Sequence, residues 1–130
     1  MSTGLPQLER AVVAEASPSA PPSKGRIAAA AIRPATLWVS VVPVFVGSAL
    51  AAADGSFLWL PALAALVGAL LIQIGTNLVN DAADFASGAD DATRLGPARA
   101  TQRGWLDGRA VWAAAWACFL LALIPGGYLV

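Results

Sequence analysis

The chain has 130 residues, of which 58% are hydrophobic and only 12% are charged, and its mean hydropathy is +0.67. Soluble domains carry about a quarter charged residues, so this composition favours a membrane protein. The formal net charge is zero and histidine is absent, which argues against a nucleic-acid partner and excludes histidine-ligated zinc sites and histidine-based catalytic pairs.

The chain begins with residues 1–26, which are rich in serine, proline and alanine and predict a disordered tail. A secretory signal peptide would have its apolar core nearer the start. The first membrane span is predicted over about 27–53, because about 20 apolar residues cross a hydrocarbon core of roughly 30 Å. Pro34 is tolerated near the start of a helix, while Pro43 in mid-span predicts a kink.

A short turn at 54–55 leads into the second span, predicted over about 57–79. A polar segment, 80–109, separates it from the third span, predicted over 110–130 with a break at 125–127. We therefore expect an all-α membrane protein, a transmembrane helix bundle. The chain stops within an apolar run that has no polar cap, which predicts that it is part of a longer protein.

The basic residues indicate how the spans are oriented. All eight lysines and arginines lie either before or at the start of the first span or within the polar segment, and the turn at 54–55 has none. By the positive-inside rule, the N-terminal tail and the polar segment are predicted to be cytoplasmic.

Acid and amide side chains cluster where the second span meets the polar segment. Asn77, Asp81 and Asp84 are spaced i, i+4, i+7, which places them on one face of a helix, and Asn80 lies four residues before Asp84. Ionisable residues at membrane depth are costly and usually face a cavity or a partner. A functional site is therefore expected at this end of the second span.

Further charges follow in the polar segment, at Asp90 and Asp91 and then at Arg94, Arg99 and Arg103. Mg²⁺ typically binds through one or two carboxylates plus substrate phosphates, and arginine suits bidentate phosphate recognition. Acids beside arginines predict a diphosphate site, with the adjoining bilayer available for a long hydrocarbon tail. The alternative is a solvated loop whose acids and arginines pair with each other.

The sequence Asn-Asp-Ala-Ala-Asp at 80–84 resembles the first aspartate-rich motif of the UbiA superfamily of intramembrane aromatic prenyltransferases. In its 4-hydroxybenzoate branch a further Asp typically follows four residues later, where this chain has Gly88 and places the acid at Asp90. The pattern across 88–104 (Gly-x-Asp, Arg-x-Gly-Pro, Gln-Arg-Gly) is instead similar to the 1,4-dihydroxy-2-naphthoate polyprenyltransferases of menaquinone synthesis. Arg-Pro-Ala-Thr at 33–36 also resembles a motif of that family's first helix.

The resemblance implies transfer of a polyprenyl group from its diphosphate to an aromatic acceptor, with Mg²⁺ as the cofactor. Ionisation leaves an allylic cation, which the electron-rich naphthoate ring attacks. The implied metal ligands are Asp81, Asp84 and Asp90. The implied catalytic residues are Asn80, Asp81 and Asp84. The implied diphosphate-binding residues are Asn77, Arg94, Arg99, Gln102 and Arg103. The implied location is the inner membrane of a bacterium.

Alternatives stay open at this point. The family has a second aspartate-rich motif in a C-terminal half that this chain lacks, so we expect the chain to be inactive alone. The acceptor could belong to the 4-hydroxybenzoate, chlorophyll or haem branch, and a transporter segment with an acidic cation site is a non-enzymatic alternative. A CDP-alcohol phosphotransferase is disfavoured because its motif is not supplied around Asp107, which is predicted to be a helix N-cap.

Overall fold

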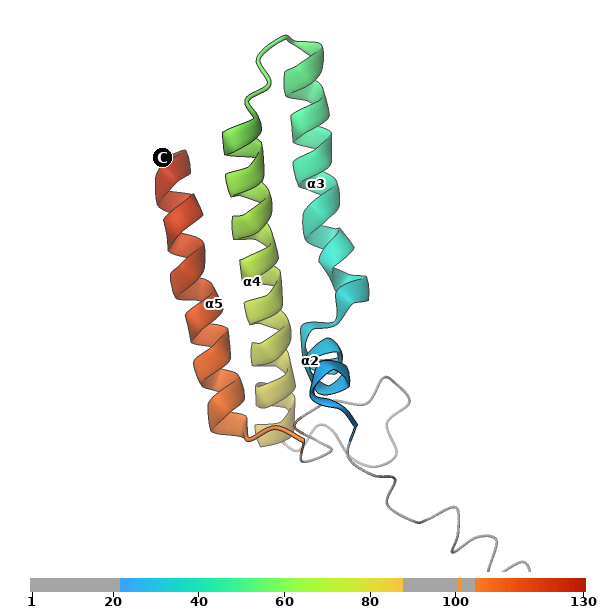
Figure 1. Cartoon of the computed structure of the whole chain (residues 1–130). Coiled ribbons are helices and arrows are strands. Elements are labelled where there is room, and N and C mark those ends of the chain that lie inside the picture. Colours follow the sequence, from blue (N-terminus) through green and yellow to red (C-terminus); the bar gives the residue numbers. More distant parts are fainter. Residues whose placement is uncertain (1–21, 88–100, 102–104) are drawn as a thin grey trace, which may run out of the picture.

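The computed structural model describes residues 22–87, 101 and 105–130 (Figure 1). Within them the chain forms four α-helices and no strand, which confirms the all-α prediction for the described part. The helices are α2 (Lys24–Ile32), α3 (Pro34–Ala53), α4 (Trp59–Ala86) and α5 (Gly108–Leu129).

The three long helices run side by side, with α4 between α3 and α5, and α2 lies beside the C-terminal part of α4 (Figure 1). One end of the bundle, which we call the polar end, contains α2, the C-terminus of α4 and the N-terminus of α5. The opposite end, where residues 54–56 connect α3 to α4, is the turn end. The candidate site residues of α4 all lie at the polar end.

The first predicted span is divided into two helices at Arg33. This residue has a left-handed backbone (φ 55°), and its N–H bonds to the carbonyl of Ala29 at 3.0 Å, which caps α2. Pro34 then starts α3, because its fixed φ suits the first turn of a helix while its ring disfavours a helical residue before it. The spanning helix therefore begins at residue 34 rather than 27, and Lys24–Arg26, predicted to belong to the tail, are helical.

The turn end is closed by a short connection after α3. The backbone N–H of Gly55 bonds to the carbonyl of Ala52, and that of Ser56 to Ala51 at 2.8 Å. Gly55 has φ 71°, a conformation that glycine adopts without a steric penalty. This confirms the turn predicted between the first two spans.

The helix α4 continues beyond the predicted end of the second span and includes Asn80, Asp81 and Asp84. The helix α5 runs through Pro125 to Leu129, so the break predicted at 125–127 is wrong. A proline in a helix removes one backbone hydrogen bond, and the flanking turns here remain helical. Pro43 likewise lies within a continuous α3.

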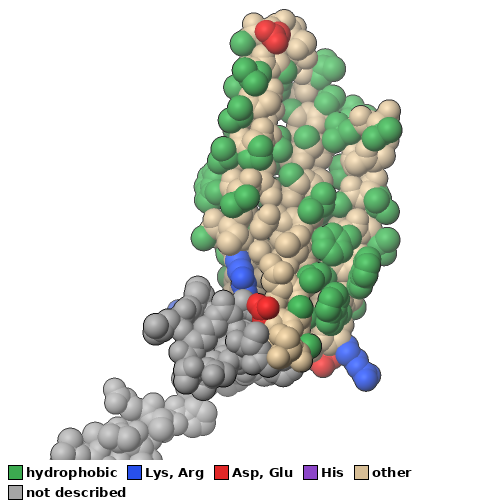
Figure 2. Space-filling view, turned by 180° about the vertical axis from the view of Figure 1, so that it is seen from behind, with side chains coloured by type: hydrophobic (Ala, Val, Ile, Leu, Met, Phe, Trp, Pro, Cys, Tyr) green, Lys and Arg blue, Asp and Glu red, His purple; other side chains and the backbone are tan. Residues whose placement is uncertain are grey.

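Large apolar side chains are exposed along the full height of the bundle, and α3 has no buried residue at all. Figure 2 shows hydrophobic side chains over the middle of one face, with acidic and basic side chains confined to its two ends. Three helices (α3, α4 through Asp84, and α5) are long and apolar enough to cross a membrane. Exposure of this kind suits contact with lipid or with further helices rather than with water.

The small buried core lies at the polar end, where α2, α4 and α5 meet. It consists of Ala31, Leu78, Ala82, Val111 and Ala115. Alanines at three of these five positions let the helix backbones approach closely, as is typical of helix contacts in membranes. The best-packed part of the described structure is therefore the part that holds the candidate site.

Candidate functional site

The predicted helical register on α4 is confirmed, and it places the site residues at different depths. Asn77 is 4% exposed and Asp81 is 1% exposed, one helical turn apart on the buried side. Asp84 is half-buried and Asn80 is exposed. The amide and carboxylate that face the interior are thus Asn77 and Asp81.

Asp81 is held by Thr101, which lies 20 residues later in the chain. The Thr101 backbone N–H donates to Oδ2 of Asp81 at 3.4 Å, and the Thr101 hydroxyl donates to the Asp81 backbone carbonyl at 3.0 Å. The other carboxylate oxygen, Oδ1, is buried and accepts no hydrogen bond from the described residues. A buried carboxylate oxygen without a donor is unfavourable unless a ligand satisfies it.

Asn77 makes contacts on the opposite side, toward the junction between α2 and α3. Its Nδ2 donates to the backbone carbonyl of Ile32 at 2.7 Å and to the hydroxyl of Thr36 at 2.8 Å. The Thr36 hydroxyl in turn donates to the carbonyl of Arg33 at 2.9 Å. The left-handed turn at Arg33 is therefore fixed directly to α4, one turn before Asp81.

Further polar contacts follow along the α3–α4 interface toward the turn end. Nε2 of Gln73 donates to Oδ1 of Asn77 at 3.4 Å, and the Ser40 hydroxyl donates to Oε1 of Gln73 at 3.3 Å. We call the four side chains Thr36, Ser40, Gln73 and Asn77 the polar ladder. Because each helix contributes two residues four apart, the ladder sets the register of α3 against α4.

The remaining predicted site residues, Asp90, Arg94, Arg99, Gln102 and Arg103, lie outside the described residues. Among the residues that are described, no group of three acidic, histidine or cysteine side chains could hold a metal ion. Asp107 occupies the N-cap position of α5 as predicted, but its side chain makes no capping hydrogen bond.

Sequence reasoning missed Thr101, Ser40 and the structural use of Gln73. Thr36 carried a signal, since it belongs to the Arg-Pro-Ala-Thr motif, and its two hydrogen bonds give that motif a physical role. Gln73 carried a weaker signal as a polar residue within an apolar span. Nothing in the local sequence distinguished Thr101.

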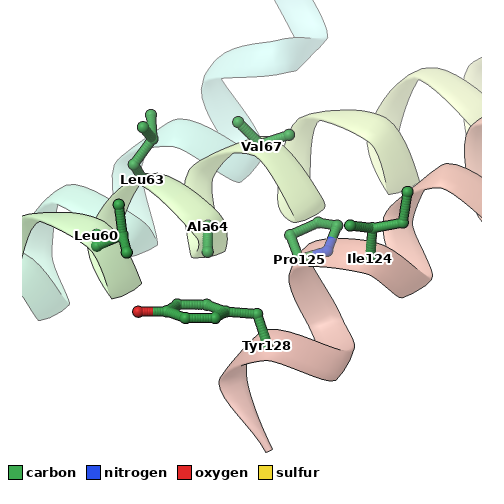
Figure 3. Close-up of a pocket in the computed structure, with 7 residues that line it drawn as sticks. All are labelled: Leu60, Leu63, Ala64, Val67, Ile124, Pro125 and Tyr128. Carbon is green, nitrogen blue, oxygen red and sulfur yellow. The ribbon is translucent and has the colours of Figure 1, made fainter.

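An apolar pocket of about 410 Å³ lies between α4 and α5, away from these residues (Figure 3). Its lining is apolar apart from the Tyr128 hydroxyl and consists of Leu60, Leu63, Ala64, Val67, Ile124, Pro125 and Tyr128. The last of these residues on α4 precedes Asp81 by 14 positions, about 21 Å along the helix axis. The pocket therefore lies toward the turn end of the bundle and is separate from the Asp81 site.

The described part of α4 therefore carries Asn-Asp-Ala-Ala-Asp at the polar end, with one oxygen of the Asp81 carboxylate hydrogen-bonded and the other without a donor among the described residues. The UbiA prenyltransferase family matches residues 40–130, and the chain belongs to this family. The family and the three spanning helices together make the protein an integral membrane protein.

Curated relatives narrow the similarity. The chain is 45% identical over 73 residues to the 1,4-dihydroxy-2-naphthoate octaprenyltransferase of Escherichia coli strain K12. The matched region covers 56% of this chain and 24% of the relative. It is 36% identical over 107 residues to the enzyme of the same name from Bacillus subtilis strain 168, covering 82% of this chain and 34% of that protein. For the Mycobacterium tuberculosis enzyme of that name the identity is 36% over 94 residues, covering 72% and 32%.

The chain thus spans between about a quarter and a third of the length of these relatives. No solved structure matches it.

Proposed function

We propose that this chain forms part of an enzyme that transfers a polyprenyl group from polyprenyl diphosphate to 1,4-dihydroxy-2-naphthoate. The observation that carries the proposal is Asp81, a carboxylate that is 1% exposed on a membrane helix and has one oxygen without a described donor. Family membership supports prenyl transfer, and the names of the relatives support the naphthoate acceptor.

The residues fit a divalent cation by their chemistry. The candidate metal ligands are all carboxylate oxygens, which Mg²⁺ prefers. The buried Oδ1 of Asp81 accepts no hydrogen bond from the described residues, which leaves it available to a cation. Asp81, Asp84 and Asp90 would hold the ion. Bound Mg²⁺ would offset the negative charge of the diphosphate and make it a better leaving group.

The other proposed roles are electrostatic. Arg94, Arg99, Gln102 and Arg103 bind the diphosphate and stabilise it as it departs. Asn77 and Asn80 orient the ligands, and the Asn77 contacts with Thr36 and Ile32 support this role by fixing α4 at the polar end. The prenyl tail then lies along the apolar helix faces, within the bilayer.

The proposed setting is the inner membrane of a bacterium, with the polar end in the cytoplasm. The charges support this orientation: Lys24, Arg26 and Arg33 lie around α2 and Arg109 starts α5, while the turn end carries no basic residue. The diphosphate site would then face the cytoplasm.

The proposal is tested by Asp81→Asn and Asp84→Asn in the membrane protein that contains this chain. Prenyl transfer to 1,4-dihydroxy-2-naphthoate is measured in membranes of matched protein content. Each substitution is expected to lower the rate about 100-fold or more, because it removes a carboxylate that would hold the divalent cation. Asp107→Asn is the matched control: this exposed carboxylate makes no capping bond, so the rate should stay within about threefold of wild type.

Wild-type turnover in Asp81→Asn would contradict the proposed function. Binding of a divalent cation with no response to polyprenyl diphosphate would instead favour the transporter alternative.

A further inference from the structure

We propose that Thr101 is a positioning residue that orients the carboxylate of Asp81, engaging Oδ2 and leaving Oδ1 as the oxygen that meets a divalent cation. This inference rests on the proposed function, since it assigns a partner to an acid of the same site.

The contact is made at two points on one residue. Thr101 is 2% exposed, its hydroxyl donates to the main-chain carbonyl of Asp81, and its own N–H donates to the side-chain oxygen Oδ2. The first bond fastens Thr101 to the backbone of α4. This places its N–H beside the Asp81 carboxylate, where the second bond, at 3.4 Å, favours one rotation of the carboxylate.

The geometry also separates the two oxygens of Asp81. Oδ2 has a donor, whereas Oδ1 is buried without one among the described residues. Hydrogen bonds that orient a metal-binding carboxylate are a general feature of metal sites, and their loss typically weakens metal binding by 10–100-fold. Thr101 has this relation to Asp81.

A purely structural role would fasten the chain at Thr101 to the bundle without tuning the carboxylate. The two roles differ in what they change. A fastening role affects thermal unfolding alone, whereas a positioning role also affects the affinity for the metal itself, measured without turnover.

The experiment measures Mn²⁺ binding by electron paramagnetic resonance on the purified membrane protein that contains this chain, with no substrate present. Thr101→Val removes the hydroxyl that fastens Thr101 to the Asp81 carbonyl, at nearly constant volume, and so removes the support that holds the Thr101 N–H beside Oδ2. This is expected to weaken Mn²⁺ binding about tenfold or more. Thr101→Ser restores the hydroxyl and should stay within about threefold of wild type. Thr76→Val is the matched control, because the Thr76 hydroxyl is exposed and bonds only within α4, to the carbonyl of Ile72.

Asp81→Asn separates this inference from the proposed function. If Asp81→Asn loses Mn²⁺ binding while Thr101→Val retains wild-type affinity, the role of Thr101 is overturned and the proposed function stands. If Asp81→Asn binds Mn²⁺ as wild type does, both are overturned. Should Thr101→Val fail to give a monodisperse protein, Thr101→Ala removes the same hydroxyl with less bulk, and the same tenfold loss is expected.

Discussion

Asn77 and Asp81 lie one helical turn apart on α4, yet their side chains are used in different ways. The Asn77 amide donates to Ile32 and Thr36 at the α2–α3 junction, while Asp81 keeps Oδ1 without a described donor. A satisfied buried amide stabilises its surroundings, whereas an unsatisfied carboxylate oxygen lowers stability until a ligand binds. Loss of the Asn77 partners should therefore reduce stability, and loss of the Asp81 charge should reduce activity.

Thr36 offers the sharpest test at the residue scale. Thr36→Val removes an acceptor for Asn77 and a donor to the Arg33 carbonyl while preserving shape. The expected cost is about 1–2 kcal/mol of unfolding free energy. The interhelical bond from Asn77 contributes about 0.6 kcal/mol on the average for membranes, and the local bond to Arg33 adds about 0.5–1.5 kcal/mol. Thermal unfolding in detergent measures it. Thr36→Ser should recover most of the lost stability. If Thr36→Val were as stable as the wild type, the proposed contribution of the Thr36 hydrogen bonds would be contradicted.

Among the elements, the hydropathy pattern was sufficient to predict three long apolar helices, and the structure confirms three helices that are long and apolar enough to cross a membrane. Pro34 accounts for the division of the first segment at Arg33, because it disfavours a helical residue before it. The division was not predicted, because the residues on both sides are apolar and read as one span. The helical course through Pro125 could not be read from the sequence. The same Pro-Gly-Gly residues end helices in other settings, so local sequence alone does not decide this course.

The α4–α5 contact depends on a close approach at Gly75. A Cβ at this position would lie 2.6 Å from the ring of Phe119, whereas a Cβ at Gly47 of α3 would meet nothing within 4 Å. Gly75→Ala is therefore expected to lower stability by about 1–3 kcal/mol through overpacking. Gly47→Ala should be neutral or raise stability by up to about 1 kcal/mol through helix propensity.

Thermal unfolding of the two variants in the same detergent compares them directly. An unchanged midpoint for Gly75→Ala would show that Phe119 moves aside without cost. Because Phe119 also forms an edge-to-face contact with Trp116, at a centroid distance of 6.0 Å, such a movement would disturb a second contact.

For the molecule as a whole, the α4 part of the site was predictable and its supports were not. The i, i+4, i+7 spacing placed Asn77 and Asp81 on one helix face, because helical periodicity is a local property. Their partners Thr36 and Thr101 lie 41 and 20 residues away from them and are brought close only by the packing of the chain. Sequence reasoning could therefore locate the acids but not the residues that orient them.

The antiparallel arrangement also brings the basic residues of the described part of the chain to one end, which yields a prediction about topology. Arg33 precedes α3, Arg109 lies in the first turn of α5, and no basic residue lies between Pro34 and Ala86. Ser87 at the polar end and Ser56 at the turn end are both exposed, so each can be replaced by cysteine in a Cys118→Ala background. In intact cells a membrane-impermeant maleimide is expected to label Ser56→Cys but to label Ser87→Cys only after permeabilisation. The Cys118→Ala parent without either cysteine controls for background labelling. The reverse pattern would invert the orientation, and it would place the diphosphate site on the side of the membrane away from the cytoplasm.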